Sequence, residues 1–162
     1  MSDFDIETAR QAGQGLKQFM GMSDAELEEH ISFEFNRRLL AHHEEMAQAK
    51  IIAEVTETRY CSAGCKVGHK LVLKAFPAVL LPEESDCPLC SKAIGPVADL
   101  VHQLWDRLSE GLDPNEGQAQ FASCLDQGIK YGGLGNVRFK VYVEKAPQAG
   151  EVLLHCTREG AA

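Results

Sequence analysis

The feature that most constrains the fold of this chain is a group of four cysteines within thirty residues. Two close-set pairs, Cys61 with Cys65 and Cys87 with Cys90, are separated by a segment that holds a glycine, an apolar run and two prolines. Both pairs can reach one point only if this segment turns back on itself. A fifth cysteine, Cys124, follows a helical pattern, so we expect a fold that gathers thiols from separate parts of the sequence.

Charge and the N-terminal residues limit the compartment and the class of partner. The formal net charge of −8 argues against a general nucleic-acid binder, which would carry a basic patch. The N-terminus bears Asp3, Asp5 and Glu7 instead of the basic start and apolar core of a signal peptide, and no apolar run is long enough to span a membrane. We therefore expect a cytoplasmic protein that binds neither nucleic acid nor membrane. In that compartment clustered thiols stay reduced and serve metal or redox chemistry.

The spacing of the four cysteines predicts a metal site. A Cys-Pro-Leu-Cys turn, such as residues 87–90, lets two sulfurs approach one ion, and tetrahedral four-cysteine sites of this layout bind zinc. The ligands would be Cys61, Cys65, Cys87 and Cys90. The same ligand set can hold an iron–sulfur cluster, the thiols can exchange with disulfides, and thiols that are merely packed in a core also produce this pattern. The spacing leaves these alternatives open.

Three further residues are candidates for the neighbourhood of this site. Cys124 is a substitute ligand or a neighbouring thiolate, and Asp126, two residues later, either caps a turn or accepts a proton beside that thiolate. His69 can replace one sulfur or stand at a strand end as a surface residue. The pair His42 and His43 cannot easily chelate one ion, because adjacent side chains on a helix point about 100° apart.

Residues 1–49 are predicted to form an N-terminal helical extension. Ser23 and Glu26 have the spacing of a capping box, which starts one continuous helix that runs to about Ala47. Its buried stripe consists of Leu27, Ile31, Phe35 and Leu39. We expect these helices to be the surface through which the protein forms a homodimer or binds a larger protein partner.

Residues 50–162 are predicted to form a cysteine-containing α+β domain. Strand patterns cover residues 51–56, 70–74 and 137–144, and an amphipathic helix follows Gly95 and Pro96 up to Leu108. The expected fold is a small, mostly antiparallel sheet with this one helix packed on it and the helical extension in front. Residues 152–157 would add a hairpin strand or form a tail.

Three separated motifs stand in one order between about residues 50 and 145: C-K-V-G, C-P-L-C before a proline-containing helix, and C-L-D before V-R-F. They resemble a family of small prokaryotic proteins of unknown function. That family shares an early Cys with G-H-K-V-G-D, then a C-P-x-A motif near the middle, and a late C-x-D-G-I leading into V-x-F-x-I. The matching residues are Cys61 or Cys65, Lys66, Val67, Gly68, Cys87, Pro88, Ala93, Pro96, Cys124, Asp126, Gly128, Val137 and Phe139.

This sequence departs from the family pattern at the thiols themselves. Cys65 stands where the family has histidine, His69 stands where it has aspartate, and Cys90 is additional. The resemblance carries no known activity, but it implies that three residues share one functional neighbourhood, namely Cys87, Cys124 and Asp126.

The sequence thus favours a small metal-binding protein with a zinc ion held by Cys61, Cys65, Cys87 and Cys90, in an accessory or structural role. The alternative is a redox or iron–sulfur enzyme subunit that uses Cys124 and Asp126.

Overall fold

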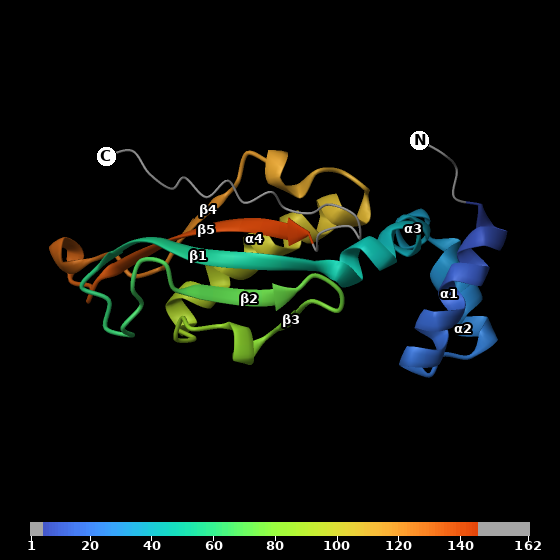
Figure 1. Ribbon diagram of the computed structural model, residues 1–162, viewed down its shortest axis with the longest axis horizontal. Coiled ribbons are helices and arrows are strands. Elements are labelled where there is room, and N and C mark those ends of the chain that lie inside the picture. The colour runs from blue at the N-terminus through green and yellow to red at the C-terminus, as the bar shows by residue number, and fades with distance from the viewer. Residues whose placement is uncertain (1–4, 146–162) are drawn as a thin grey trace, which may run out of the picture.

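A computed structural model describes residues 5–145 and confirms the α+β class (Figure 1). The protein begins with helices α1 (Ile6–Met20), α2 (Asp24–Ser32) and α3 (Glu34–Gln48). An antiparallel sheet and one long helix, α4 (Ser91–Ser109), follow. Within the described residues, no helix combines the length and the apolar character that crossing a membrane requires.

The sheet is built around its longest strand, β1 (Ala49–Arg59). Over residues 5–145 the strand order is β3-β2-β1-β5-β4, and every neighbouring pair is antiparallel. β5 pairs with β1 along its whole length, with a bulge between Val55 and Glu57. The other strands are β2 (Lys70–Lys74), β3 (Val79–Leu80), β4 (Phe121–Ser123) and β5 (Asn136–Lys145).

The main core lies between the sheet and α4, which lies behind the sheet in Figure 1 and packs on β1, β4 and β5. Alternate side chains of β5 point into this core, as the period of two in its sequence predicts. Buried residues on this strand are Val137, Phe139, Val141 and Val143. The apolar face of α4 supplies the opposite wall, with Val97, Leu100, Val101, Leu104 and Leu108.

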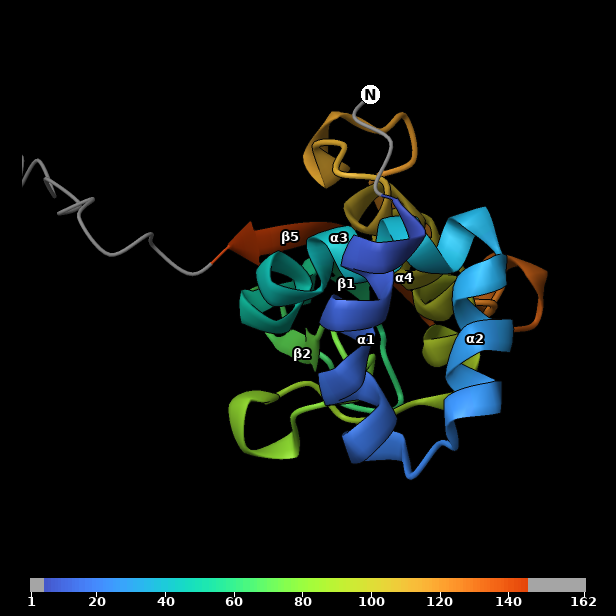
Figure 2. The same cartoon turned by 90° about the vertical axis from the view of Figure 1, so that its right-hand side faces the viewer.

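A second, smaller core holds the N-terminal helices together at one end of the molecule (Figure 2). Its buried residues are Ala9, Leu27, Ile31 and Leu40. The two cores meet on α3, because Leu39 and Met46 of this helix belong to the main core. α3 ends at Gln48 and β1 begins at the next residue, so the predicted boundary after residue 49 falls where helix passes into strand without a loop.

The prediction of one continuous helix over residues 23–47 is wrong. The capping box of Ser23 and Glu26 is present, but the helix ends at Ser32, and Phe33 adopts an extended backbone before α3 begins. In a continued helix the last carbonyls of α2 would bind backbone N–H groups four residues on. Here they accept side-chain donors instead: Asn36 Nδ2 binds the oxygen of His30, and Arg37 Nη1 binds those of Ile31 and Ser32.

The prediction that the long helix starts after Gly95 and Pro96 is also wrong, since α4 begins at Ser91 and holds Pro96 inside it. Proline lacks the N–H that would bind the carbonyl four residues earlier, which belongs to Lys92. The N–H of Leu125 takes this place and donates to the Lys92 oxygen at 2.8 Å. The predicted hairpin strand at 152–157 lies outside the described residues.

Candidate thiol site

The five cysteines of residues 5–145 come from three segments of the protein, and all are free thiols. One segment joins β1 to β2, the next leads into α4, and the third follows β4. All five pack against the main core, where Cys65 and Cys87 are buried. A cavity of about 30 Å³ lies among four of them, namely Cys61, Cys65, Cys90 and Cys124.

The loop of the first pair is fixed to β1 by local hydrogen bonds. The N–H of Gly64 donates to the oxygen of Cys61 at 3.1 Å, in a turn that Gly64 closes with a φ of 79°. The hydroxyl of Thr58 donates to the oxygen of Cys65 at 3.2 Å. Cys61 and Cys65 are therefore held close to the end of the central strand.

The second pair is fixed to β2 and to α4. The N–H groups of Asp86 and Cys87 both donate to the oxygen of Lys70, at 3.0 and 3.1 Å, which places Cys87 beside the first residue of β2. There its sulfur lies 3.2 Å from that of Cys65. Cys90 is the N-cap residue of α4, so its sulfur lies at the positive end of the helix dipole.

The acidity of the thiols differs across the site. Burial raises the pKa of Cys61, but hydrogen bonds from the backbone of Cys65, Ala63 and Gly64 outweigh it and lower this pKa below that of an ordinary thiol. Burial also raises the pKa of Cys65 and of Cys87, and for these two thiols the net effect is upward. In the metal-free protein at neutral pH, Cys65 and Cys87 therefore keep their protons.

Cys124 directly follows β4 and lines the same cavity. Its N–H donates to the oxygen of Val137 at 2.9 Å, and its sulfur accepts the N–H of Val137 at 3.3 Å. The bond from Leu125 to Lys92 then ties the following residue to the first turn of α4. Pro96 thus contributes to the site, because it leaves the Lys92 carbonyl free for this contact.

Asp126 organises the loop between β4 and β5. Its Oδ1 accepts the N–H groups of Gly128, Leu134 and Gly135 at 3.0, 2.9 and 3.2 Å. Its Oδ2 accepts Lys92 Nζ at 2.7 Å, and the side chain is only 8% exposed. The ion pair with Lys92 and these N–H donors lower the pKa of Asp126 far below the ordinary aspartate value. The carboxylate is thus engaged as a turn acceptor, which is one of the two roles that the sequence predicts for it.

Lys92 is the residue at this site that the sequence did not single out. Its ammonium pairs with Asp126, and its pKa is raised first by that carboxylate and further by Cys90 and Cys124. The one sequence feature that could have indicated Lys92 was its position two residues after Cys90. It was not used, because the helix was predicted to begin only after Pro96, beyond Lys92.

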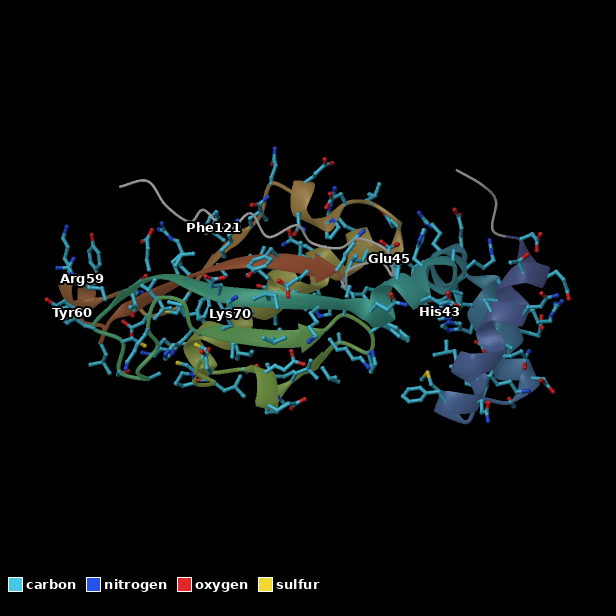
Figure 3. All side chains as sticks on the ribbon, in the orientation of Figure 1. His43, Glu45, Arg59, Tyr60, Lys70 and Phe121 are labelled. Atoms are coloured by element: carbon cyan, nitrogen blue, oxygen red, sulfur yellow. The ribbon has the colours of Figure 1, made fainter. Side chains whose placement is uncertain are left out.

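Within residues 5–145, the histidines do not join the thiols in a preformed metal site. His69 Nδ1 accepts the N–H of Lys66 at 3.3 Å, within the turn that leads into β2. His43 Nδ1 lies 2.6 Å from the oxygen of Leu40 on α3, and Figure 3 labels His43 next to the N-terminal helices, away from Arg59 and Tyr60. Among residues 5–145, no three His, Cys, Asp or Glu side chains are arranged so that they could coordinate one ion.

The sequence matches no protein-family model, no curated protein and no solved structure. The resemblance of residues 50–145 to the small prokaryotic family therefore stays a prediction.

Proposed function

We propose that the protein binds a metal ion through four thiolates, those of Cys61, Cys65, Cys87 and Cys90. Zinc is the ion that a four-thiolate set without open positions favours, and it would serve an accessory or structural role. The observation that carries the proposal is the 3.2 Å separation of the sulfurs of Cys65 and Cys87, because it brings one member of each pair together.

One sulfur pair lies near the separation that a zinc site requires, although no three His, Cys, Asp or Glu side chains of residues 5–145 are arranged to coordinate one ion. A Zn–S bond of about 2.3 Å in a tetrahedron puts neighbouring sulfurs about 3.8 Å apart, so the pair would separate by about 0.6 Å. Cys61 and Cys90 would turn toward the ion from the loop and from the first turn of α4. Metal binding and the final closure of these two segments would therefore be one event.

The positions of the ligands support a structural role. The ion would tie the loop after β1 to the start of α4, and so link the central strand to the helix that covers it. It would also replace the contact between two buried protonated thiols by strong metal–sulfur bonds.

A second candidate function, thiol–disulfide chemistry, is favoured by the same sulfur pair. A disulfide bond of about 2.05 Å between Cys65 and Cys87 would form when both thiols lose their protons and pass two electrons to an oxidant such as oxidised glutathione. That oxidant leaves as two reduced thiols. The wider redox alternative would use Cys124 beside Lys92, with Asp126 as the residue that positions this lysine.

Metal analysis of the full-length protein separates these functions. The protein is purified without oxygen, its metal content is measured, and cobalt(II), which absorbs visible light when thiolates bind it, replaces the zinc. We expect one ion per protein molecule and an intense sulfur-to-cobalt band. A brown protein with bound iron and sulfide would favour the cluster, and a metal-free protein with freely titrating thiols would contradict the metal proposal.

Serine variants identify the ligands. Cys87→Ser and Cys90→Ser should weaken zinc binding by at least tenfold. Cys124→Ser should retain the ion, although Cys124 lines the same cavity as Cys90. If Cys124→Ser loses the ion instead, the ligand set proposed here is incorrect. For the disulfide candidate, mild oxidation should lower the mass by two hydrogens in the parent protein but not in Cys65→Ser.

A further inference from the structure

A second, larger cavity lies next to the thiol site, at the end of the sheet farthest from the N-terminal helices. Its volume is about 500 Å³, within the range of small-molecule sites. Its walls come from the end of β1 and from the loop between β4 and β5. Figure 3 labels Arg59 and Tyr60 at this end, opposite His43. The side chains that matter here are Arg59, Tyr60, Gln127, Ile129, Lys130 and Asn136.

The charge of this cavity is opposite to that of the protein. Of the charged side chains in residues 5–145, Arg59 and Lys130 line it and no carboxylate does, although the whole protein has a formal net charge of −8. Within residues 5–145, neither of these two cations has a salt-bridge partner, whereas the neighbouring Arg138 pairs with Glu57. Two unpaired cations in one concave site attract an anion.

Each of the two cations lies over an aromatic ring. The guanidinium carbon of Arg59 is 5.4 Å from the ring centre of Tyr60, and Lys130 Nζ is 5.3 Å from that of Tyr131. Such contacts hold a cation near a flat apolar surface. The tyrosine at position 60 is 65% exposed and Ile129 is 59% exposed. A ligand that combines an anionic group with a flat apolar body would match both features.

The backbone of the two walls is fixed before any ligand arrives. Tyr60 has a φ of 53°, which is rare for a residue with a side chain and concentrates at binding sites. Gly135 has a φ of 152°, and a Cβ at this position would lie 2.0 Å from the oxygen of Tyr60. Only glycine permits this approach. On the other side, Asp126 holds the N–H groups of Gly128 and Gly135. A site formed in advance loses less entropy when it binds.

We propose that this cavity binds an anionic small molecule, a carboxylate or a phosphate, that carries a flat apolar group. Arg59 and Lys130 hold the anion, and the ring of Tyr60 lies against the flat group. The inference does not depend on the metal site. Gly135 and Asn136 line both cavities, so these two residues separate the proposed ligand from the cavity that Cys61 and Cys124 line.

A small molecule fits the site better than a nucleic acid does. A strand of nucleic acid follows a long basic groove, and its affinity comes from many phosphate contacts. Here the described part of the protein lines the cavity with only two positive side chains, and the protein as a whole is acidic.

Binding of simple probes to the full-length protein tests the proposal by NMR. The probes are phenyl phosphate, benzoate, inorganic phosphate and the neutral benzamide, each raised to millimolar concentration. We expect phenyl phosphate or benzoate to shift backbone signals of residues 127–136, and the stronger of the two identifies the anion. Inorganic phosphate should bind more weakly because it lacks the ring. Benzamide should bind at least tenfold more weakly, because it lacks the charge.

Charge variants provide the matched comparison. Arg59→Gln and Lys130→Gln should each weaken binding of the better probe about tenfold, the effect of losing one charge-assisted hydrogen bond. Lys140→Gln serves as the control: Lys140 also lies over a tyrosine, 5.7 Å from the ring of Tyr142, but does not line the cavity. Unchanged amide spectra outside the site verify folding.

Any of four results would overturn the proposal. One is the absence of binding by every anionic probe, and another is equal binding of benzamide. The third is an equal loss in Lys140→Gln, which would mean that overall charge, not the cavity, attracts the anion. A single-stranded oligonucleotide that binds more tightly than phenyl phosphate would equally contradict a small-molecule site.

Discussion

In the proposed metal site, Cys65 and Cys87 would make ion binding depend on pH. Both thiols have pKa values raised by burial, so each holds a proton at neutral pH in the metal-free protein. A thiol must lose its proton to become a ligand, so zinc binding releases at least these two protons. Affinity should therefore rise at least a hundredfold for each pH unit around neutrality, because each of the two thiols contributes a factor of about ten.

The measurement is competition with a zinc chelator of known affinity across this pH range. In Cys65→Ser the dependence should be about tenfold smaller per pH unit than in the parent protein, because one proton fewer is released. An affinity that does not change with pH would show that neither buried thiol is a ligand.

Asp126 holds its loop through contacts that require the ionised carboxylate. Asp126→Ala removes the acceptor of three N–H groups and the partner of Lys92, whereas Asp126→Asn keeps one acceptor oxygen and loses the ion pair. Both variants should be less stable than the parent protein, and alanine should be the worse. Asp99 on α4 provides the control, since Asp99→Ala should change stability little.

The pH dependence of this effect has a definite sign. Because the pKa of Asp126 is lowered in the folded protein, its contribution to stability is present above the ordinary aspartate pKa of about 3.9 and is lost as pH falls through the lower folded value. In urea unfolding, the difference in unfolding free energy between the parent protein and Asp126→Ala should be constant near neutral pH. This difference should become smaller only below about pH 4. A difference that disappears near pH 6 would assign the effect to another group.

At the scale of single residues, the sequence predicted the cysteine pairs but not the contacts that position them. The spacing predicts a tight turn over residues 87–90, whereas the structure has a bend at Cys87 and no turn over residues 88–90. The spacing does not indicate that Asp86 and Cys87 bind the oxygen of Lys70, or that Lys92 pairs with Asp126. Those contacts join residues that are far apart in the sequence, and no local pattern encodes them.

At the scale of elements, two glycines of α1 test how closely this helix meets α2. A Cβ at Gly13 would lie 2.8 Å from Leu27 Cδ1, whereas a Cβ at Gly15 would have no neighbour within 4 Å. Gly15→Ala should stabilise the protein by about 0.5–1 kcal/mol, because alanine loses less backbone entropy in a helix. Gly13→Ala should gain less or destabilise, because the buried Leu27 must move. Urea unfolding measures both, and equal gains would contradict the close packing of α1 on α2.

The two errors in predicting helices have one physical cause. Apolar residues recur every fourth position from Leu27 to Leu39, so periodicity gives no sign of the break that Asn36 and Arg37 stabilise. At α4 a proline indicates a helix start, yet Leu125 compensates for the missing N–H of Pro96. In both places a donor that is not part of the helix's own backbone hydrogen bonding binds a helix carbonyl, and this bond determines where the helix ends or continues. The strands were predicted better, since the alternation in β5 depends on burial alone.

For the whole molecule, the metal should stabilise one end and leave the other unchanged. The proposed ligands lie in residues 61–90, around the main core, whereas α1 and α2 share a separate small core. Zinc should therefore slow amide hydrogen exchange in residues 58–69 and 85–94, with little effect in α1 and α2. Exchange with and without a chelator measures this difference, and equal protection at every position would show that the ion acts elsewhere or stabilises the fold globally.

The most direct test of the proposed metal site is X-ray absorption at the zinc edge, recorded on the full-length protein purified without oxygen. Four thiolate ligands predict four sulfur neighbours at about 2.3 Å and no nearer shell. A shell of nitrogen or oxygen atoms at about 2.0–2.1 Å in place of sulfur, or protein that holds no zinc at all, would contradict the proposal that these cysteines form a metal centre.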